Sequence, residues 1–289
     1  MENKENLGAF KASFLIIKES FGILKQEKEI LFFPIAAFFT HLALVAVFFS
    51  AIFFLILGGS LDTKVENVNG GNIIAFSIFF TYYIVSLFIT NFYQTGVFSI
   101  AHARFSGGDI SFGDGMRAAW SKFGVLILWS IVMATVGVII SCIERQRTLG
   151  WIVGKILGVA WTVLTYFSLP LLVIGNKNIK DSFEESASIM KKTWGETAFV
   201  YFGTGYATFL IALSIFLLPF LSLFAADSVF YPVLFVLVGI AIFLLICLVV
   251  ITSALNAIFK LALYEYASTG RVPQGFSEEL VTKGVRSKE

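Results

Sequence analysis

Apolar residues recur with the same spacing in three segments of the chain, and each segment leads directly into a long apolar stretch. The positions i, i+4, i+7 and i+11 are filled by Phe10, Phe14, Ile17 and Phe21, then by Phe112, Met116, Ala119 and Phe123, and finally by Phe183, Ala187, Met190 and Trp194. These spacings return to one face of an α-helix, so they predict three amphipathic helices and a threefold internal repeat. A glycine follows each last aromatic residue, and we expect a sharp elbow at Gly22, Gly124 and Gly195.

Six apolar stretches are long enough to cross the hydrocarbon core of a bilayer, which takes about 20 helical residues. They cover residues 30–57, 73–100, 123–143, 151–174, 198–225 and 229–264. Lipid offers no partner for backbone N–H and C=O groups, so these spans are expected to be helical. The predicted fold class is all-α, a polytopic membrane helix bundle of six transmembrane helices. Pro34 and Pro232 suit the first turns of their spans, whereas Pro170 and Pro219 are expected to kink or end theirs.

The predicted repeat is one interfacial amphipathic helix followed by a hairpin of two spans, so the three repeats are parallel in the membrane. We place a single membrane domain over residues 1–289, with repeat one at 7–105, repeat two at 109–176, repeat three at 181–267 and a cytoplasmic tail at 268–289. The second and third amphipathic helices open with residues suited to cap a helix N-terminus: Asp109 and Ser111, then Asp181 and Ser182.

Composition and charge support a membrane protein and give its orientation. Hydrophobic residues make up 57% of the chain and charged residues 14%, which excludes an ordinary soluble domain. Most of the 21 basic residues lie on the side of the spans that holds both termini, whereas the opposite loops hold Lys64, Arg145 and Arg147. An excess of basic residues marks the cytoplasmic side. We therefore expect a multi-pass protein of the cell membrane with both termini in the cytoplasm.

The loops on the outer side are short, at about residues 58–72 and 144–150 and near Asp227, which excludes an external catalytic or binding domain. The amphipathic helices are expected in the cytoplasmic interface, with their apolar faces in the acyl boundary and lysines such as Lys11 and Lys18 facing anionic headgroups. Membrane lipids are therefore the expected partners, together with a protein partner or a second copy of the chain. No nucleic acid partner is expected.

Polar residues inside the spans are the candidate site residues, because such groups are costly in lipid and often functional. The repeat offsets relate Gln94 to Thr165 and to Asn256, so the even-numbered spans can place polar groups at similar depth. Asn91 and Lys260 extend this candidate polar cluster. One interpretation is a solute path, and the other is a set of hydrogen bonds between helices. His102 and Glu265 lie near the cytoplasmic ends of their spans, and a pairing of Lys260 with Glu265 is a further hypothesis.

Signatures of catalysis and cofactor binding are absent from the sequence. It contains no HExxH, GxSxG, P-loop or dinucleotide-binding glycine motif, and only two histidines. Cys142 and Cys247 both lie in apolar runs, so neither a disulfide framework nor a cysteine metal site is expected. No cleavable signal peptide is expected either. We predict no catalytic residues, no metal and no cofactor.

Several motifs resemble those of an uncharacterised prokaryotic integral-membrane family of unknown function. They comprise Ala160–Trp161, Thr165–Tyr166–Phe167, Pro170, Ser186, Lys191–Lys192–Thr193–Trp194–Gly195–Glu196, Gly113–Asp114–Gly115, Leu263–Tyr264–Glu265–Tyr266–Ala267–Ser268–Thr269–Gly270, Pro273 and Gly275–Phe276. The resemblance implies a six-span bundle in bacteria or archaea without an assigned activity. This chain has Gly175 where an acidic residue is frequent in the family, so a role for that acid is not carried over.

Two functions of different classes follow from these features. The first is a non-enzymatic scaffold or accessory protein that uses its cytoplasmic amphipathic helices for lipid or partner contact. The second is a transporter or channel for a small solute or ion, built on the candidate polar cluster. A third hypothesis, an intramembrane or lipid-modifying enzyme, is the weakest, because no nucleophile with a base beside it stands out in the sequence.

Overall fold

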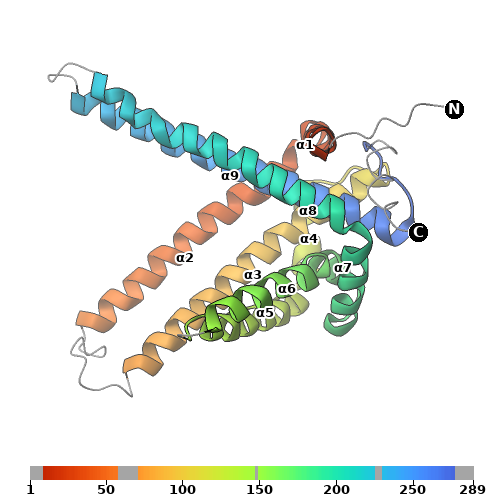
Figure 1. The fold of residues 1–289 in the computed structure, drawn as a ribbon, viewed down its shortest axis with the longest axis horizontal. Coiled ribbons are helices and arrows are strands. Elements are labelled where there is room, and N and C mark those ends of the chain that lie inside the picture. The colour runs from red at the N-terminus through yellow and green to blue at the C-terminus, as the bar shows by residue number, and fades with distance from the viewer. Residues whose placement is uncertain (1–8, 58–70, 147–148, 225–229, 277–289) are drawn as a thin grey trace. The chain divides into compact units, whose positions relative to one another are not determined.

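The computed structural model describes residues 9–57, 71–146, 149–224 and 230–276 (Figure 1). These residues form helices and no strand, which confirms the all-α class. The elements follow in the order α1 (Ala9–Gln26), η1 (Lys28–Leu31), α2 (Phe32–Leu57), α3 (Gly71–Phe105), α4 (Phe112–Ser121), α5 (Phe123–Glu144), α6 (Gly150–Thr165), α7 (Ser168–Val173), α8 (Ile179–Leu217), η2 (Leu218–Phe224) and α9 (Phe230–Thr269). Most of the predicted outer loops and of the tail falls outside the described residues.

Five helical segments are long and apolar enough to cross a membrane. They are Lys28–Leu57, Ile73–Phe105, Phe123–Glu144, Gly150–Val173 and Tyr231–Thr269, and each overlaps a predicted span. Large apolar side chains such as Phe39, Phe54 and Phe235 are exposed along them, as lipid contact requires. In the region predicted as the fifth span, the described apolar helix Thr208–Leu221 is shorter than a crossing requires.

The prolines act as predicted. Pro34 and Pro232 lie in the first turns of α2 and α9, where a helix needs no hydrogen bond from the missing N–H group. The helix that carries Pro170 is interrupted between α6 and α7, just before the proline. Pro219 follows the end of α8, where the chain tightens into η2.

The predicted glycine elbows are wrong at all three positions. Helix α1 continues past Gly22 to Gln26, and α8 continues past Gly195 to Leu217. The break between α4 and α5 falls at Lys122, before Gly124. Among the described residues, glycines with positive φ are instead found at 107, 270 and 275. A glycine inside a helix costs about 1 kcal/mol relative to alanine, and neighbouring residues can sustain the helix through it.

The side chains of Ser111 and Asn178 cap the N-termini of α4 and α8. The Ser111 hydroxyl accepts a hydrogen bond from the Asp114 N–H at 3.3 Å, and the Asp114 carboxylate accepts one from the Ser111 N–H at 3.2 Å. The Ser111 hydroxyl also donates to the Asp114 carboxylate at 2.7 Å, and this bond, followed by the one from the Ser111 N–H, lowers the pKa of Asp114. The cap predicted at Ser111 is confirmed. At α8 the capping residue is Asn178, whose side-chain oxygen accepts from the Asp181 N–H at 2.8 Å, rather than Asp181 or Ser182.

The described chain forms two compact units. The first unit comprises the described parts of Met1–Leu31, Ala101–Asp109 and Ile189–Glu289, and the second comprises those of Phe32–Ile100 and Ile110–Ser188. In the first unit, α1, η1 and η2 pack on α9. In the second unit, α5 and α6 form a hairpin that α7 extends (Figure 1).

The ring of Phe33 packs between α3 and α4 in the core of the second unit. Phe33 is fully buried and lies 4.6 Å, centroid to centroid, from the ring of Phe112. Gly96 of α3 and Gly115 of α4 both face this ring, because a β-carbon at either position would collide with it. The two glycines let α3, α4 and the start of α2 approach closely, which is a common way of packing membrane helices.

Serines of α8 satisfy the backbone where α6 and α7 separate. The break leaves the N–H of Phe167, a fully buried residue, without an intrahelical partner. The hydroxyl of buried Ser186 accepts a hydrogen bond from this N–H at 3.0 Å. The Ser168 hydroxyl donates to the backbone oxygen of Ser182 at 3.4 Å. These bonds join α8 to the break before Pro170.

Candidate functional site

Charged and ionisable side chains gather in the first unit where α1, α3 and α9 end. We call this set the helix-end cluster, and it consists of Glu27, His102, Arg104, Asp109 and Glu265. Two of its contacts are ion pairs between segments that are distant in the sequence. The turn after α9 adds an apolar contact, since the rings of Phe105 and Phe276 lie 5.8 Å apart.

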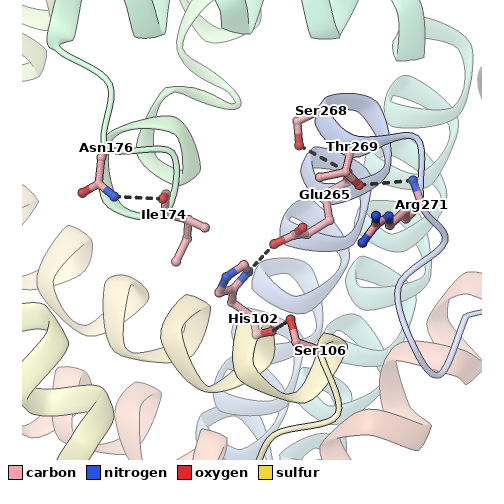
Figure 2. A network of polar contacts seen from close by, with 8 residues as sticks. All are labelled: His102, Ser106, Ile174, Asn176, Glu265, Ser268, Thr269 and Arg271. Carbon is pink, nitrogen blue, oxygen red and sulfur yellow. Dashed lines mark hydrogen bonds and ion pairs between the residues drawn. The ribbon is translucent and has the colours of Figure 1, made fainter.

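The first contact joins α3 to α9. Figure 2 shows the imidazole of His102 directed at the Glu265 carboxylate, and Nδ1–H of His102 donates to Oε1 of Glu265. The His102 side chain is 42% exposed and that of Glu265 is 15% exposed. The hydroxyls of Ser106 and Thr269 donate to the backbone oxygens of His102 and Glu265, at 3.3 Å and 2.7 Å. Both partners therefore lie one helical turn before a hydroxyl residue that reinforces the helix end.

The second contact joins α3 to the residue after α1. The Arg104 guanidinium lies 3.4 Å from Oε1 of Glu27 and donates to Oε1 of Gln26 at 2.5 Å. Glu27 is buried, and burial is the main cause that raises the pKa of its carboxyl group. The negative charge of Asp109 raises that pKa further, whereas Arg104 lowers it. Glu29 also raises the pKa slightly, so the Glu27 carboxyl group has one cation and two anions nearby.

We expect the His102–Glu265 contact to contribute modestly to stability. The variants His102→Gln, Glu265→Gln and the double variant form a cycle that isolates the pair. Because the histidine is partly exposed to solvent, the coupling is expected to be about 1 kcal/mol or less. Denaturant titration of the full chain in detergent micelles measures it. A coupling of zero would show that the contact does not stabilise the fold.

The raised pKa of Glu27 predicts a pH dependence of stability. A folded-state pKa above the ordinary value of 4.5 means that the folded chain binds this proton more tightly than the unfolded chain does. The resulting stabilisation is complete below pH 4.5 and is lost as the pH rises through the folded-state pKa. In Glu27→Gln this loss should be absent, so the unfolding free energy should change less with pH just above 4.5. Glu184→Gln, an exposed change of the same charge, is the control. Equal pH slopes in wild type and Glu27→Gln would contradict the assignment.

The ends of α3 and α9, which carry His102 and Glu265, share a backbone conformation that the apolar spacing does not predict. Gly107 and Gly270 both adopt positive φ, of 77° and 69°, and each follows the hydroxyl residue of the pair described above. The two glycines are 163 residues apart, the same separation as His102 and Glu265. The offset that relates Gln94 to Asn256 is 162 residues, one fewer than this separation. The serine–glycine and threonine–glycine steps are the signal that would have aligned His102 with Glu265.

The predicted polar cluster is distributed over both units. Asn91, Gln94 and Thr165 belong to the second unit, on α3 and α6, whereas Asn256 and Lys260 belong to α9 of the first unit. Asn91 donates to the hydroxyl of buried Ser130 at 3.2 Å, a hydrogen bond between α3 and α5.

Thr165 donates to the backbone oxygen of Trp161 within its own helix, at 2.8 Å. Gln94 and Lys260 are half-buried and Asn256 is exposed. Asn91 therefore takes the role of a bond between helices, and the convergence of the five residues on a solute path stays a prediction.

Several predicted interfacial residues contact protein. In α4, Ala119 is fully buried and Phe112 and Met116 are half-buried, and Phe123 at the start of α5 is exposed. In α8, Phe183 lies 5.4 Å from the rings of both Trp129 and Trp161, and Met190 is buried. In α1, Phe21 is exposed. The side chains of Phe10, Phe14, Ile17 and Trp194 lie outside the described residues. The lipid contact of the whole set stays a prediction, but Ala119 and Met190 pack against the chain itself.

The solvent-exposed face of α4 carries an aromatic ring and basic side chains. Trp120 is 58% exposed and stacks on Phe123, with ring centroids 5.5 Å apart and planes at 16°. Arg117 projects from the same short helix, and Lys122 lies at the junction with α5. The Lys122 ammonium donates to the side-chain oxygen of Asn176. An amphipathic ring beside cationic side chains at the end of an apolar span is typical of the membrane–water interface.

The fold defines a class: an all-helical protein with several helices long and apolar enough to span a membrane. The chain belongs to a family of unknown function, DUF6159, whose model matches residues 73–276. This confirms the resemblance to a family of unknown function. The match covers α3 to the turn after α9, and therefore includes His102, Arg104 and Glu265. Neither a curated protein nor a solved structure matches the chain. Among the described residues, no group of three histidine, cysteine or acidic side chains is placed to hold a metal ion.

Proposed function

We propose that this protein is a non-enzymatic membrane scaffold that contacts lipid headgroups through the helices at its cytoplasmic face. The proposal includes six spans in three parallel repeats, cytoplasmic termini and a prokaryotic source. The observation that carries it is the exposed Trp120–Phe123 stack beside Arg117 and Lys122. Such a surface suits the headgroup layer, because its ring needs an apolar environment and its cations need phosphates or water.

Backbone geometry supports the three repeats. Four described residues have positive φ, and three of them follow the second span of a predicted repeat: Gly107 after α3, Asn176 after α7 and Gly270 after α9. A left-handed residue is a common way to end a helix and reverse the chain. If the chain contains three copies of the same unit, each copy should end its second span in the same way, with one left-handed residue.

Polar contacts within the spans support a scaffold. Thr40 of α2 bonds to the Tyr93 hydroxyl of α3 at 2.8 Å. His41 of α2 lies 3.2 Å, by its Nε2 atom, from the backbone oxygen of Ser86. Together with the bond from Asn91 to Ser130, these contacts link α3 to α2 and to α5. Hydrogen bonds of this kind hold membrane helices together.

Quenching of Trp120 by brominated lipid tests the proposal. The full chain is reconstituted in bilayers whose acyl chains carry bromine either near the headgroup or near the bilayer centre. The difference in fluorescence between wild type and Trp120→Phe is the emission of Trp120. We expect bromine near the headgroup to quench this emission more than bromine near the bilayer centre. Trp129→Phe, which removes a buried ring, is the control, and the quenching of Trp120 by shallow bromine should be the same in this variant as in wild type. Access to an aqueous quencher together with no effect of bromine at either depth would overturn the proposal.

A further inference from the structure

Helix α1 ends directly before the first helical segment that is long and apolar enough to cross a membrane. Its last residue is Gln26, and the first apolar span begins at Lys28. A helix joined to a span by one residue has its end within the headgroup layer, because the span begins there. The surface of α1 therefore faces either protein, headgroups or water.

One face of α1 is held against the first unit. Ser20, Ile23 and Leu24 are at most 4% exposed, and α1 packs on α9. Gly275, in the turn after α9, lies next to Ile23. The rotation of α1 about its own axis is thereby set, and the opposite face is directed outward.

The outward face carries an exposed aromatic residue between two exposed lysines. Lys18 and Lys25 are exposed, and Phe21 between them is 41% exposed. The Lys25 ammonium lies 5.2 Å from the centroid of the Phe21 ring. Lys11, Lys18 and Lys25 occur at intervals of seven residues within this one helix, so their positions share a face.

The chemistry of this face matches an anionic lipid. Helix α1 holds three lysines and one glutamate, Glu19, so its net charge is positive. An exposed phenylalanine ring favours the acyl boundary, and the ammonium groups beside it favour phosphate oxygens. An acidic protein would satisfy the lysines, but it would not account for an apolar ring at the membrane surface.

We propose that α1 binds anionic phospholipids, with Lys18 and Lys25 on the headgroup phosphates and Phe21 in the acyl boundary. This inference rests on the proposed function, because it names the lipid that one of the cytoplasmic helices contacts. It makes the first unit sensitive to lipid charge through the packing of α1 on α9.

Binding of a defined lipid to the full chain in detergent micelles tests this inference. The probes are phosphatidylglycerol, phosphatidylcholine and inorganic phosphate, and the readout is retained lipid by native mass spectrometry together with the thermal midpoint. The double variant Lys18→Gln/Lys25→Gln should bind phosphatidylglycerol about 10- to 30-fold more weakly than wild type, because each lysine contributes about three- to fivefold. Binding of phosphatidylcholine should not change.

A charge-matched control separates this face from a general effect of positive charge. Lys177→Gln/Lys180→Gln removes the same charge from the start of α8 and should bind phosphatidylglycerol as wild type does. An equal loss in both double variants, or no loss in Lys18→Gln/Lys25→Gln, would overturn the inference. If inorganic phosphate raises the thermal midpoint of the chain as much as phosphatidylglycerol does, the ligand is not the lipid. Displacement of bound phosphatidylglycerol by an acidic polypeptide would also contradict the lipid as the ligand.

Failure of the inference and failure of the proposed function are distinguishable. If phosphatidylglycerol shows no preference for α1 but shallow bromine quenches Trp120, the scaffold proposal stands and the inference is wrong. If bromine at neither depth quenches Trp120, the proposed function itself is wrong.

Discussion

Replacement of Gly96 by alanine is expected to lower the free energy of unfolding by about 2 kcal/mol or more. A β-carbon at this position of α3 would overlap the ring of Phe33. Overpacking of a tight core costs about 1–3 kcal/mol and occasionally more, and the better helix propensity of alanine returns at most about 1 kcal/mol. The clash is severe, so we expect a cost at the top of this range.

The Phe33 ring is enclosed by several neighbours, which limits how far it can move to make room. It is fully buried, it lies against the Phe112 ring, and Gly115 approaches it from α4. A β-carbon at Gly115 would lie 2.7 Å from Cζ of Phe33 and 3.3 Å from the backbone oxygen of Gly96. Gly115→Ala should therefore be destabilising for the same reason, with α3 and α4 forced apart.

A glycine in open space provides the matched control. A β-carbon at Gly239, within α9, would meet no atom within 4 Å. Gly239→Ala should therefore be neutral or stabilising by up to about 1 kcal/mol, the opposite sign from Gly96→Ala. Denaturant titration in detergent micelles measures both variants.

A double-mutant cycle links the effect to Phe33. Phe33→Ala alone is expected to cost about 3–5 kcal/mol, because it leaves a cavity in a closed core. In that background Gly96→Ala should cost little, since the ring that it would strike is gone. A coupling of about 1–3 kcal/mol is expected. Additive effects of the two substitutions would show that Phe33 is not the obstacle.

The sequence predicted the helices and their proline interruptions well, because both depend on local physics. Apolar length sets a span, and the missing N–H of Pro170 or Pro219 sets where a helix weakens. The glycine elbows were wrong because Gly22 and Gly195 lie within continuous helices. A glycine permits a turn but does not require one, and the neighbouring residues decide.

Amphipathic periodicity alone does not say what the apolar face contacts. In α4 the spacing placed Ala119 on the apolar face, but that side chain packs against protein, whereas Trp120, which is exposed, lies outside the i, i+4, i+7 and i+11 pattern. A period of 3.6 is the same for a face in lipid and a face in a core. The structure was needed to tell them apart.

The helix-end cluster was beyond prediction from spacing alone, because His102 and Glu265 are 163 residues apart. Their meeting depends on how α3 and α9 pack, which a single sequence does not specify. The repeat nevertheless gave an indirect signal, since both residues lie five positions before a glycine with positive φ. Internal repeats can thus identify equivalent helix ends before their contacts are known.

Replacement of Ser186 by alanine is expected to lower the free energy of unfolding by about 1–3 kcal/mol. The hydroxyl of Ser186 accepts the hydrogen bond from the N–H of Phe167 at 3.0 Å, and both residues are buried. Without the hydroxyl, the N–H that the break between α6 and α7 leaves open has no partner, and a buried unpaired donor costs about this amount.

Two variants separate the lost bond from a general effect of substitution in α8. Ser188→Ala removes an exposed hydroxyl two residues further along the same helix and should change stability by less than about 0.5 kcal/mol. Ser186→Thr keeps the oxygen and should retain more stability than Ser186→Ala. Equal stability of Ser186→Ala and Ser188→Ala would mean that the Phe167 N–H finds another acceptor. The two alanine variants therefore decide whether α8 holds the break before Pro170 in place.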